Sequence, residues 1–165
     1  MTEPNAYDVL FLCTHNSARS IMGEVIIDYL GKGRFRGYSA GSMPATAPNP
    51  FALKTLANLK FPTAGLRSKN WDEFAKPDAP VMDFVITVCD NAANEVCPIW
   101  PGQPITAHWG VEDPSLAKGT DEQKLREFAR VAHILRRRIQ FFLSLPLAKL
   151  DALMIQKQVR KIGQQ

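Results

Sequence analysis

Two short, almost continuous apolar runs stand out in the hydrophobic pattern of the chain, at residues 7–13 and 83–89. Strands that are apolar on both faces are typical of a buried parallel sheet, so both runs predict central strands. Residues 34–40 alternate between polar and apolar positions and predict a strand nearer an edge, and residues 105–109 are a weaker candidate. The pattern therefore indicates four candidate strands.

Apolar residues with helical spacing separate these strands. One such stretch covers residues 21–30 and is expected to end at Gly31. Asn49, which precedes a proline, is typical of a helix start. Thr120 opens a capping-box pattern before the long apolar stripe of residues 125–142. The alternation of strands and helices predicts a doubly wound α/β sheet, in which ligands bind beyond the carboxyl ends of the strands.

The end of the chain predicts a helical extension of the main domain. Residues 146–165 have the spacing of an amphipathic helix, and we expect them to pack against the domain formed by residues 1–145. A contact between two copies of the chain is the alternative, so the expected state is a monomer or a homodimer. The arginines at 136–138 are expected to face solvent.

Composition limits the classes of protein to which the chain can belong. A length of 165 residues suggests one domain, and 45% hydrophobic with 22% charged residues excludes a mainly disordered or collagen-like chain. The net charge of +4 could favour an anionic substrate but does not indicate nucleic acid. No apolar run reaches about 18 residues and no signal-peptide pattern is visible, so we expect a cytoplasmic protein without a membrane anchor. Three cysteines fit a reduced compartment better than a disulfide scaffold.

The segment between the first predicted strand and the next helix combines a thiol with an anion site. It reads Cys13-Thr14-His15-Asn16-Ser17-Ala18-Arg19-Ser20. A helix start offers unpaired N–H groups, and a loop this short can curl them around one tetrahedral oxyanion, to which Arg19 adds two parallel hydrogen bonds. The same field should lower the pKa of Cys13, and Ser20 could hydrogen-bond its sulfur, so we expect a thiolate nucleophile at neutral pH. A small buried hydrophobe at a strand end is the simpler interpretation of the cysteine alone.

The same residues resemble a known family. Their Cys-x5-Arg-Ser pattern is similar to the loop of the low-molecular-weight tyrosine phosphatases and of the arsenate reductases built on that fold. The resemblance continues through residues 38–41, 85–89 and 108–114, and the last two segments are more similar to the reductases. It implies a three-layer αβα fold with a four-stranded parallel sheet. It also implies reduction of arsenate to arsenite for arsenic detoxification, with no bound cofactor and no catalytic metal.

Two further cysteines fit the chemistry that this reduction needs. Cys89 ends a predicted core strand, and Cys97 follows a polar segment. Attack of Cys89 on Cys13 would release arsenite, and Cys97 could then attack Cys89. By resemblance this is the triple-cysteine scheme of the thioredoxin-coupled enzymes, and the external reductant would be thioredoxin, or glutaredoxin with glutathione. Core packing for Cys89 and a stray thiol for Cys97 are the simpler interpretations.

The resemblance also assigns roles to residues outside the loop. Asp113 matches the aspartate with which the phosphatases protonate the leaving oxygen, and in a reductase it could protonate a departing hydroxide. A plain Asp-Pro turn is the alternative. Some family members bind a structural potassium ion near the loop. Asn16, Glu24 and Ser39 match part of that pattern, whereas Asn70 stands where an acidic ligand is expected.

Two other functions stay open at this point. A phosphatase for phosphotyrosine or small phosphoesters would use Cys13, Arg19 and Asp113 and would need neither Cys89 nor Cys97. Such an enzyme would frame its site with aromatic residues, and the two residues after the Asp-Pro pair supply none. A non-catalytic oxyanion sensor would not need the cysteine, arginine and aspartate together. The reductase is therefore the preferred hypothesis.

Overall fold

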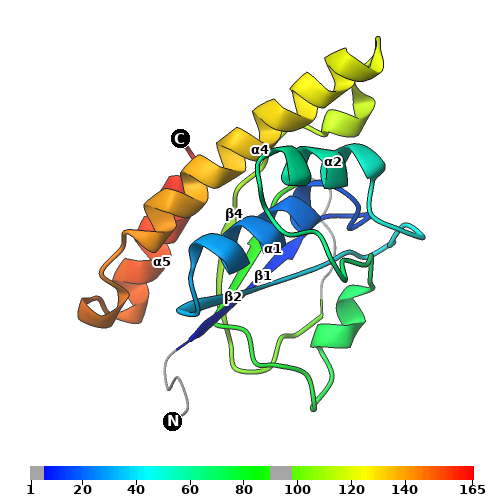
Figure 1. Cartoon of the computed structure of the whole chain (residues 1–165). Helices are drawn as coiled ribbons and strands as arrows, with labels where there is room; N and C mark the ends of the chain where they lie inside the picture. Colours follow the sequence, from blue (N-terminus) through cyan, green and yellow to red (C-terminus); the bar gives the residue numbers. More distant parts are fainter. Residues whose placement is uncertain (1–5, 90–97) are drawn as a thin grey trace.

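The four candidate strands pair in parallel to form one sheet in the computed structural model, which describes residues 6–89 and 98–165 (Figure 1). The strands are β1 (Tyr7–Leu12), β2 (Phe35–Ala40), β3 (Phe84–Thr87) and β4 (Ile105–His108), in the order β2-β1-β3-β4. Leu12 pairs with Ala40 and with Thr87, and Thr87 pairs with His108. The segments that follow the four strands therefore meet at one edge of the sheet.

The helices begin and end close to the positions that the sequence indicates. They are α1 (Arg19–Leu30), α2 (Pro50–Asn58), α4 (Asp121–Leu143) and α5 (Ala152–Ile162), with 3₁₀ turns at Trp71–Phe74, Pro114–Leu116 and Leu147–Lys149. Thr120 and Gln123 form the expected capping box, and the Asn49 side chain accepts a hydrogen bond from the Phe51 N–H. The local start signals are thus confirmed.

Residues of β1 alternate between two hydrophobic cores, which explains why the strand is apolar on both faces. Val9 and Phe11 belong to the larger core, to which α1, α2, α4 and α5 contribute. Leu10 and Leu12 belong to a smaller core with Trp71, whose 3₁₀ turn covers the opposite face. The predicted α/β fold with a four-stranded parallel sheet is confirmed.

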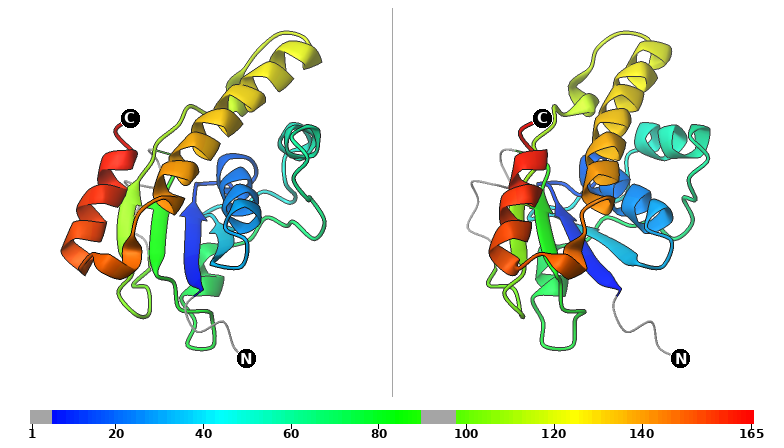
Figure 2. Two further views of the ribbon diagram at one scale, coloured as in Figure 1. Left: turned by 60° about the vertical axis from the view of Figure 1, so that its left-hand side comes forward. Right: turned by 90° about the vertical axis from the view of Figure 1, so that its left-hand side faces the viewer.

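Helix α5 packs against β4 and α4, as the two views in Figure 2 show. Val159 and Ile162 are buried in the larger core, and the indole Nε1 of Trp109 donates a hydrogen bond to the Val159 carbonyl at 2.9 Å.

Arg138 does not face solvent, contrary to the expectation for residues 136–138. It is buried, and its guanidinium donates to the carbonyl oxygens of Gly110 and Gln165.

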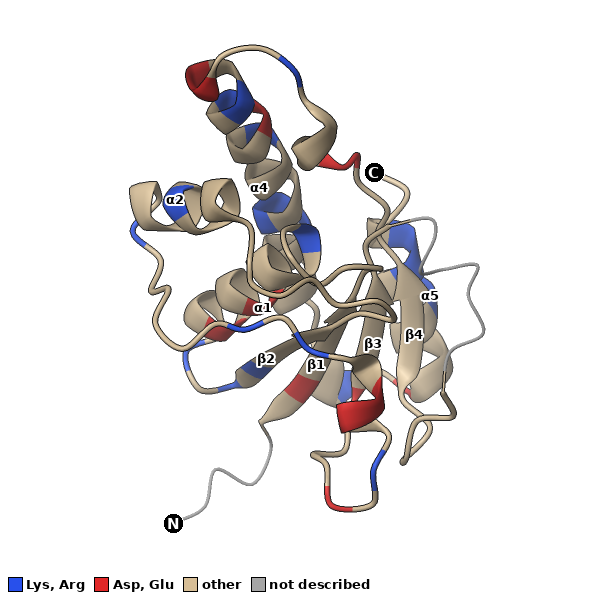
Figure 3. Cartoon of the chain, turned by 90° about the vertical axis from the view of Figure 1, so that its right-hand side faces the viewer, with Lys and Arg blue, Asp and Glu red and all other residues tan. Residues whose placement is uncertain are grey.

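Helix α4 carries acidic and basic residues close together (Figure 3). Arg126 pairs with Glu122, and Arg130 pairs with Glu127.

None of the helices in the two described stretches combines the length and apolar character that a membrane crossing requires.

Candidate active site

Cys13 lies directly beyond β1, and the loop that follows it leads into α1 at Arg19. The Cys13 side chain is buried, with 3% of the residue exposed. Within the described residues no side chain caps the start of α1, so N–H groups of the first turn can donate hydrogen bonds to an anion. The loop predicted from the sequence is therefore in place at the carboxyl edge of the sheet.

Ser20 and Asn16 surround the sulfur of Cys13 from within the loop. The Ser20 hydroxyl oxygen lies 2.8 Å from Cys13 Sγ, and Asn16 Nδ2 donates to that same oxygen at 2.8 Å. Because the Ser20 oxygen accepts a hydrogen bond from Asn16, its own O–H is left to donate to the sulfur. This hydrogen bond favours the thiolate over the thiol.

The prediction of a lowered pKa for Cys13 is wrong in direction. Burial of the thiol raises its pKa above the ordinary value for cysteine, hydrogen bonds from Ser20 lower it, and the charge of Cys89 raises it further. Arg19 acts in the lowering sense but is the weakest of these influences. The prediction considered the field of the helix without the desolvation of the sulfur.

Neighbouring segments bind the carbonyl groups of the loop from outside. The N–H groups of Met43, Ala45 and Asn49 donate to the carbonyls of Thr14, His15 and Ser17, and the distances are 2.8–2.9 Å. Carbonyl oxygens repel an anion, so this arrangement leaves the N–H side of the loop for the ligand. His15 is exposed, and its Nδ1 lies 3.0 Å from the Met43 carbonyl.

A glycine lets the chain after β2 approach this loop. A side chain at Gly41 would collide with the carbonyl oxygens of Cys13 and Thr14. The Gly41 N–H also donates to the Lys69 carbonyl at 3.0 Å. The close approach joins the loop after β1 to residues 68–70.

Arg19 and Asp113 come together across the site. An Arg19 nitrogen lies 3.5 Å from Asp113 Oδ2, and another donates to the Val111 carbonyl at 3.0 Å. The other Asp113 oxygen accepts hydrogen bonds from the N–H and the hydroxyl of Ser115. Asp113 therefore both caps the turn at Pro114–Leu116 and faces the arginine of the loop.

Cys89 lies beyond β3, beside the loop. Its residue is 3% exposed, and its Sγ lies 3.6 Å from the Thr14 hydroxyl oxygen. Cys97 lies outside the described residues.

Residues 68 and 69 hold Asn16 from behind, and sequence reasoning missed both. The Ser68 hydroxyl donates to the Asn16 carbonyl at 2.6 Å, and the Lys69 N–H donates to Asn16 Oδ1 at 2.9 Å.

Burial lowers the pKa of Lys69 and raises the pKa of Glu24, and the charge of each residue opposes the pKa shift of the other. Asn70, which was considered as an ion ligand, instead caps the turn at Trp71–Phe74.

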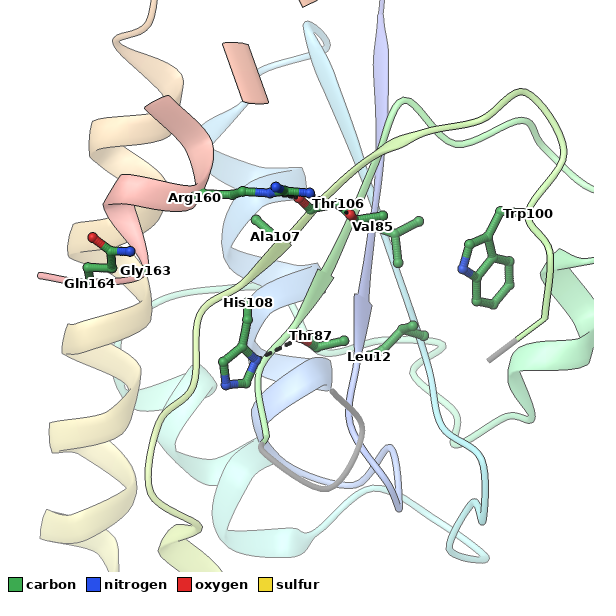
Figure 4. Close-up of a pocket in the computed structure, with 10 residues that line it drawn as sticks. All are labelled: Leu12, Val85, Thr87, Trp100, Thr106, Ala107, His108, Arg160, Gly163 and Gln164. Carbon is green, nitrogen blue, oxygen red and sulfur yellow. Dashed lines mark hydrogen bonds between the residues drawn. The ribbon is translucent and has the colours of Figure 1, made fainter. Parts of the chain in front are cut away.

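A separate pocket of about 570 Å³ opens beside β3 and β4 (Figure 4). None of the loop residues 13–20 lines it. His108 Nδ1 lies 2.7 Å from the Thr87 hydroxyl oxygen in its wall. Its other lining residues are Leu12, Val85, Trp100, Thr106, Ala107, Arg160, Gly163 and Gln164. The pocket is thus a neighbour of the anion loop and not part of it.

Comparisons with known proteins find similarity over most of the chain. A profile of the family described as low molecular weight phosphotyrosine protein phosphatase matches residues 8–158. The arsenate reductase of Halalkalibacterium halodurans is 38% identical over 135 residues, which are 81% of this chain and 93% of that protein. The arsenate reductase of Bacillus subtilis is 36% identical over 135 residues, with the same shares covered.

Solved structures show the same similarity. An arsenate reductase in the phosphate binding state superposes with a TM-score of 0.68 at 28% identity, over 84% of this chain and 97% of that one. The thioredoxin-dependent arsenate reductase of Corynebacterium glutamicum has a TM-score of 0.56 at 23% identity, over 84% of this chain and 64% of that one. At this low identity, the similarity to the second structure shows that the fold is shared and nothing more.

Proposed function

The chain belongs to the low molecular weight phosphotyrosine protein phosphatase family, and we propose that it reduces arsenate to arsenite. Curated arsenate reductases that align with 81% of its length support this activity. The observation that carries the proposal is the second buried thiol: Cys89 lies against the loop that holds Cys13, in contact with Thr14. A phosphatase has no use for a thiol at that place.

The reaction begins with arsenate in the loop formed by residues 13–20. Backbone N–H groups of Thr14, His15, Asn16, Ser17, Ala18, Arg19 and Ser20 surround the oxyanion, and the Arg19 guanidinium binds two of its oxygens. The thiol proton of Cys13 passes to an arsenate oxygen, and Ser20 stabilises the thiolate that remains. This thiolate attacks arsenic, an S–As bond forms, and one oxygen leaves. Asp113 supplies the proton that turns the departing hydroxide into water.

Electron transfer follows through the second thiol. The Cys89 thiolate attacks the sulfur of Cys13, a disulfide forms, and the electron pair of the S–As bond passes to arsenic. Arsenic is reduced from As(V) to As(III) and leaves as arsenite, while two thiolates become one disulfide. Cys97 then attacks Cys89, which releases Cys13 as a thiolate and leaves a disulfide between Cys89 and Cys97.

An external thiol reductant completes the cycle. The intrachain disulfide needs two electrons, and a dithiol protein of the thioredoxin type is suited to supply both in one exchange. Glutaredoxin with glutathione is the alternative donor. Both donors are characteristic of a reducing compartment, so we propose that the enzyme works in the cytoplasm.

Hydrolysis of phosphate monoesters is the second candidate activity. Arg19, which ends the loop that begins at Cys13, pairs with Asp113, and these three groups would be sufficient for a phosphocysteine that water then hydrolyses. Neither residue after the Asp-Pro pair, Ser115 or Leu116, is aromatic, so these two positions offer no ring to stack on a phosphotyrosine.

One pair of assays separates the two activities. Arsenate-dependent consumption of a thioredoxin-coupled or glutaredoxin-coupled reductant is compared with hydrolysis of an aryl phosphate by the same preparation. The proposal expects reductant consumption to dominate. Hydrolysis without any arsenate-dependent consumption under either donor would assign the chain to the phosphatases instead.

A further inference from the structure

Lys69 is a buried lysine that the proposed reaction does not use. Its side chain is 9% exposed, and its ammonium nitrogen is surrounded by oxygen atoms behind the anion loop. The distances from Nζ are 2.7 Å to the Ser39 carbonyl, 3.3 Å to the Ser39 hydroxyl, 3.0 Å to the Arg67 carbonyl, 3.4 Å to Asn16 Oδ1 and 3.6 Å to Glu24 Oε1.

Three of the residues that supply these oxygens, Asn16, Glu24 and Ser39, are those that match part of the potassium-binding pattern in the sequence. Potassium is held by oxygen atoms that replace its hydration shell. Asn16, Glu24 and Ser39 do converge, but the point at which they converge is filled by the Lys69 ammonium. Asn70 is directed to the N–H of Asp72 instead. The residues therefore do not fit a bound potassium ion.

We propose that the Lys69 ammonium is a built-in monovalent cation that holds Asn16 in position and makes oxyanion binding independent of potassium. It is a positioning residue, because it acts on the loop through Asn16 and does not touch the anion. The proposal deepens the function proposed above, since it concerns the loop that would take arsenate.

Asn16 is the residue through which Lys69 reaches the nucleophile. Its φ of +47° lies in the left-handed region, which costs energy for a residue with a side chain unless its surroundings hold it there. Lys69 binds Asn16 Oδ1 through both its N–H and its ammonium, and Asn16 Nδ2 then binds Ser20. Ser20 in turn contacts the Cys13 sulfur. Three successive contacts thus join the buried cation to the thiol.

Glu24 explains why a charged lysine is tolerated behind the loop. A buried ammonium is costly unless a negative charge and hydrogen-bond acceptors accompany it. Glu24 accepts a hydrogen bond from Ser39 and lies 3.6 Å from Lys69 Nζ. The cation, its counter-charge and its acceptors therefore form one buried cluster with Asn16 at its edge.

The affinity of the loop for inorganic phosphate tests the proposal without any turnover. Dissociation constants are measured calorimetrically in potassium chloride and in choline chloride of equal ionic strength, for the wild type, Lys69→Ala and Lys76→Ala. Lys76 is an exposed lysine and controls for the loss of one positive charge. Circular dichroism checks that each variant is folded.

The wild type is expected to bind phosphate equally in both salts. Lys69→Ala is expected to bind about tenfold more weakly in choline, because Asn16 loses a hydrogen bond from a charged group, and to recover in potassium, which can enter the vacated oxygen cage. Lys76→Ala is expected to match the wild type.

Three results would overturn the proposal. The first is a phosphate affinity of the wild type that depends on potassium. This measurement needs no variant, so it stays informative even if Lys69→Ala does not fold. Another is full affinity of Lys69→Ala in choline. The third is a loss that potassium does not restore, which would make Lys69 a structural residue only. If the phosphate affinities follow the expected dependence on potassium but the wild type does not reduce arsenate, the proposed function alone is refuted.

Discussion

Cys13 and Cys89 occupy equivalent places on neighbouring strands and are equally buried, yet their surroundings differ. Each follows a central parallel strand, and each residue is 3% exposed. Cys13 is followed within six residues by α1 and is contacted by Ser20, whereas Cys89 contacts the Thr14 hydroxyl. Burial at a strand end therefore does not decide which of the two thiols would attack the oxyanion. The helix start and its hydrogen bonds distinguish the first thiol from the second.

Serine substitutions at the two positions should produce the largest effects. Cys13→Ser is expected to lower both arsenate reduction and aryl phosphate hydrolysis by at least about a thousandfold, because it removes the attacking atom of both reactions. Cys89→Ser should abolish arsenate reduction and leave hydrolysis intact, because water completes the hydrolysis. Steady-state rates of both reactions are the measurement. If Cys89→Ser lost hydrolysis as well, the two thiols would not be distinct in function.

Arg19→Lys sharpens the same contrast, because an arginine follows Cys13 by six residues, whereas residues 90–97 after Cys89 contain none. Lysine keeps the charge but cannot form two parallel hydrogen bonds with an oxyanion. We expect kcat/KM to fall by about 10²–10³-fold for both reactions, as for the loss of an oxyanion donor. Arg126→Lys on the exposed face of α4 is the matched control. An unchanged kcat/KM in Arg19→Lys would remove the arginine from the site.

Asp113→Asn should have a smaller effect and should act on the chemistry at Cys13 alone. Loss of the proton donor is expected to slow aryl phosphate hydrolysis by about a hundredfold. Asparagine keeps an oxygen for the N–H of Ser115, so the turn at Pro114–Leu116 should survive. The effect should shrink for esters whose leaving group needs no protonation. A uniform loss across leaving groups would indicate a structural role.

Local signals predicted the elements well, because each lies within a few residues of its effect. The apolar runs of β1 and β3, the capping box at Thr120 and the N-cap at Asn49 all depend on neighbours in the sequence. The partners of the loop do not. Lys69 lies 53 residues from Asn16, and Arg138 lies 28 residues from Gly110. No pattern in the intervening sequence signals that these side chains turn inward.

The titration of Cys13 should respond in opposite directions to its two neighbours, and these are the smallest of the expected effects. Ser20→Ala removes a hydrogen bond that lowers the pKa of Cys13, so the alkylation profile should move to higher pH. Cys89→Ser removes a charge that raises this pKa, so the profile should move to lower pH. Ser17→Ala, in the same loop, serves as the control. Alkylation rates of Cys13, followed by mass spectrometry across pH, provide the measurement. Shifts of equal sign would contradict the arrangement around the sulfur.

Trapping the disulfides during arsenate turnover tests the account most directly. The protein is mixed with arsenate and excess alkylating agent, and its disulfides are mapped by peptide mass spectrometry. The Cys97→Ser variant should yield a Cys13–Cys89 disulfide, because the second thiol then has no onward partner, and the wild type should yield Cys89–Cys97. Undiminished arsenate reduction in Cys89→Ser, with Cys13 joined to an external thiol, would contradict the relay between the two strand ends.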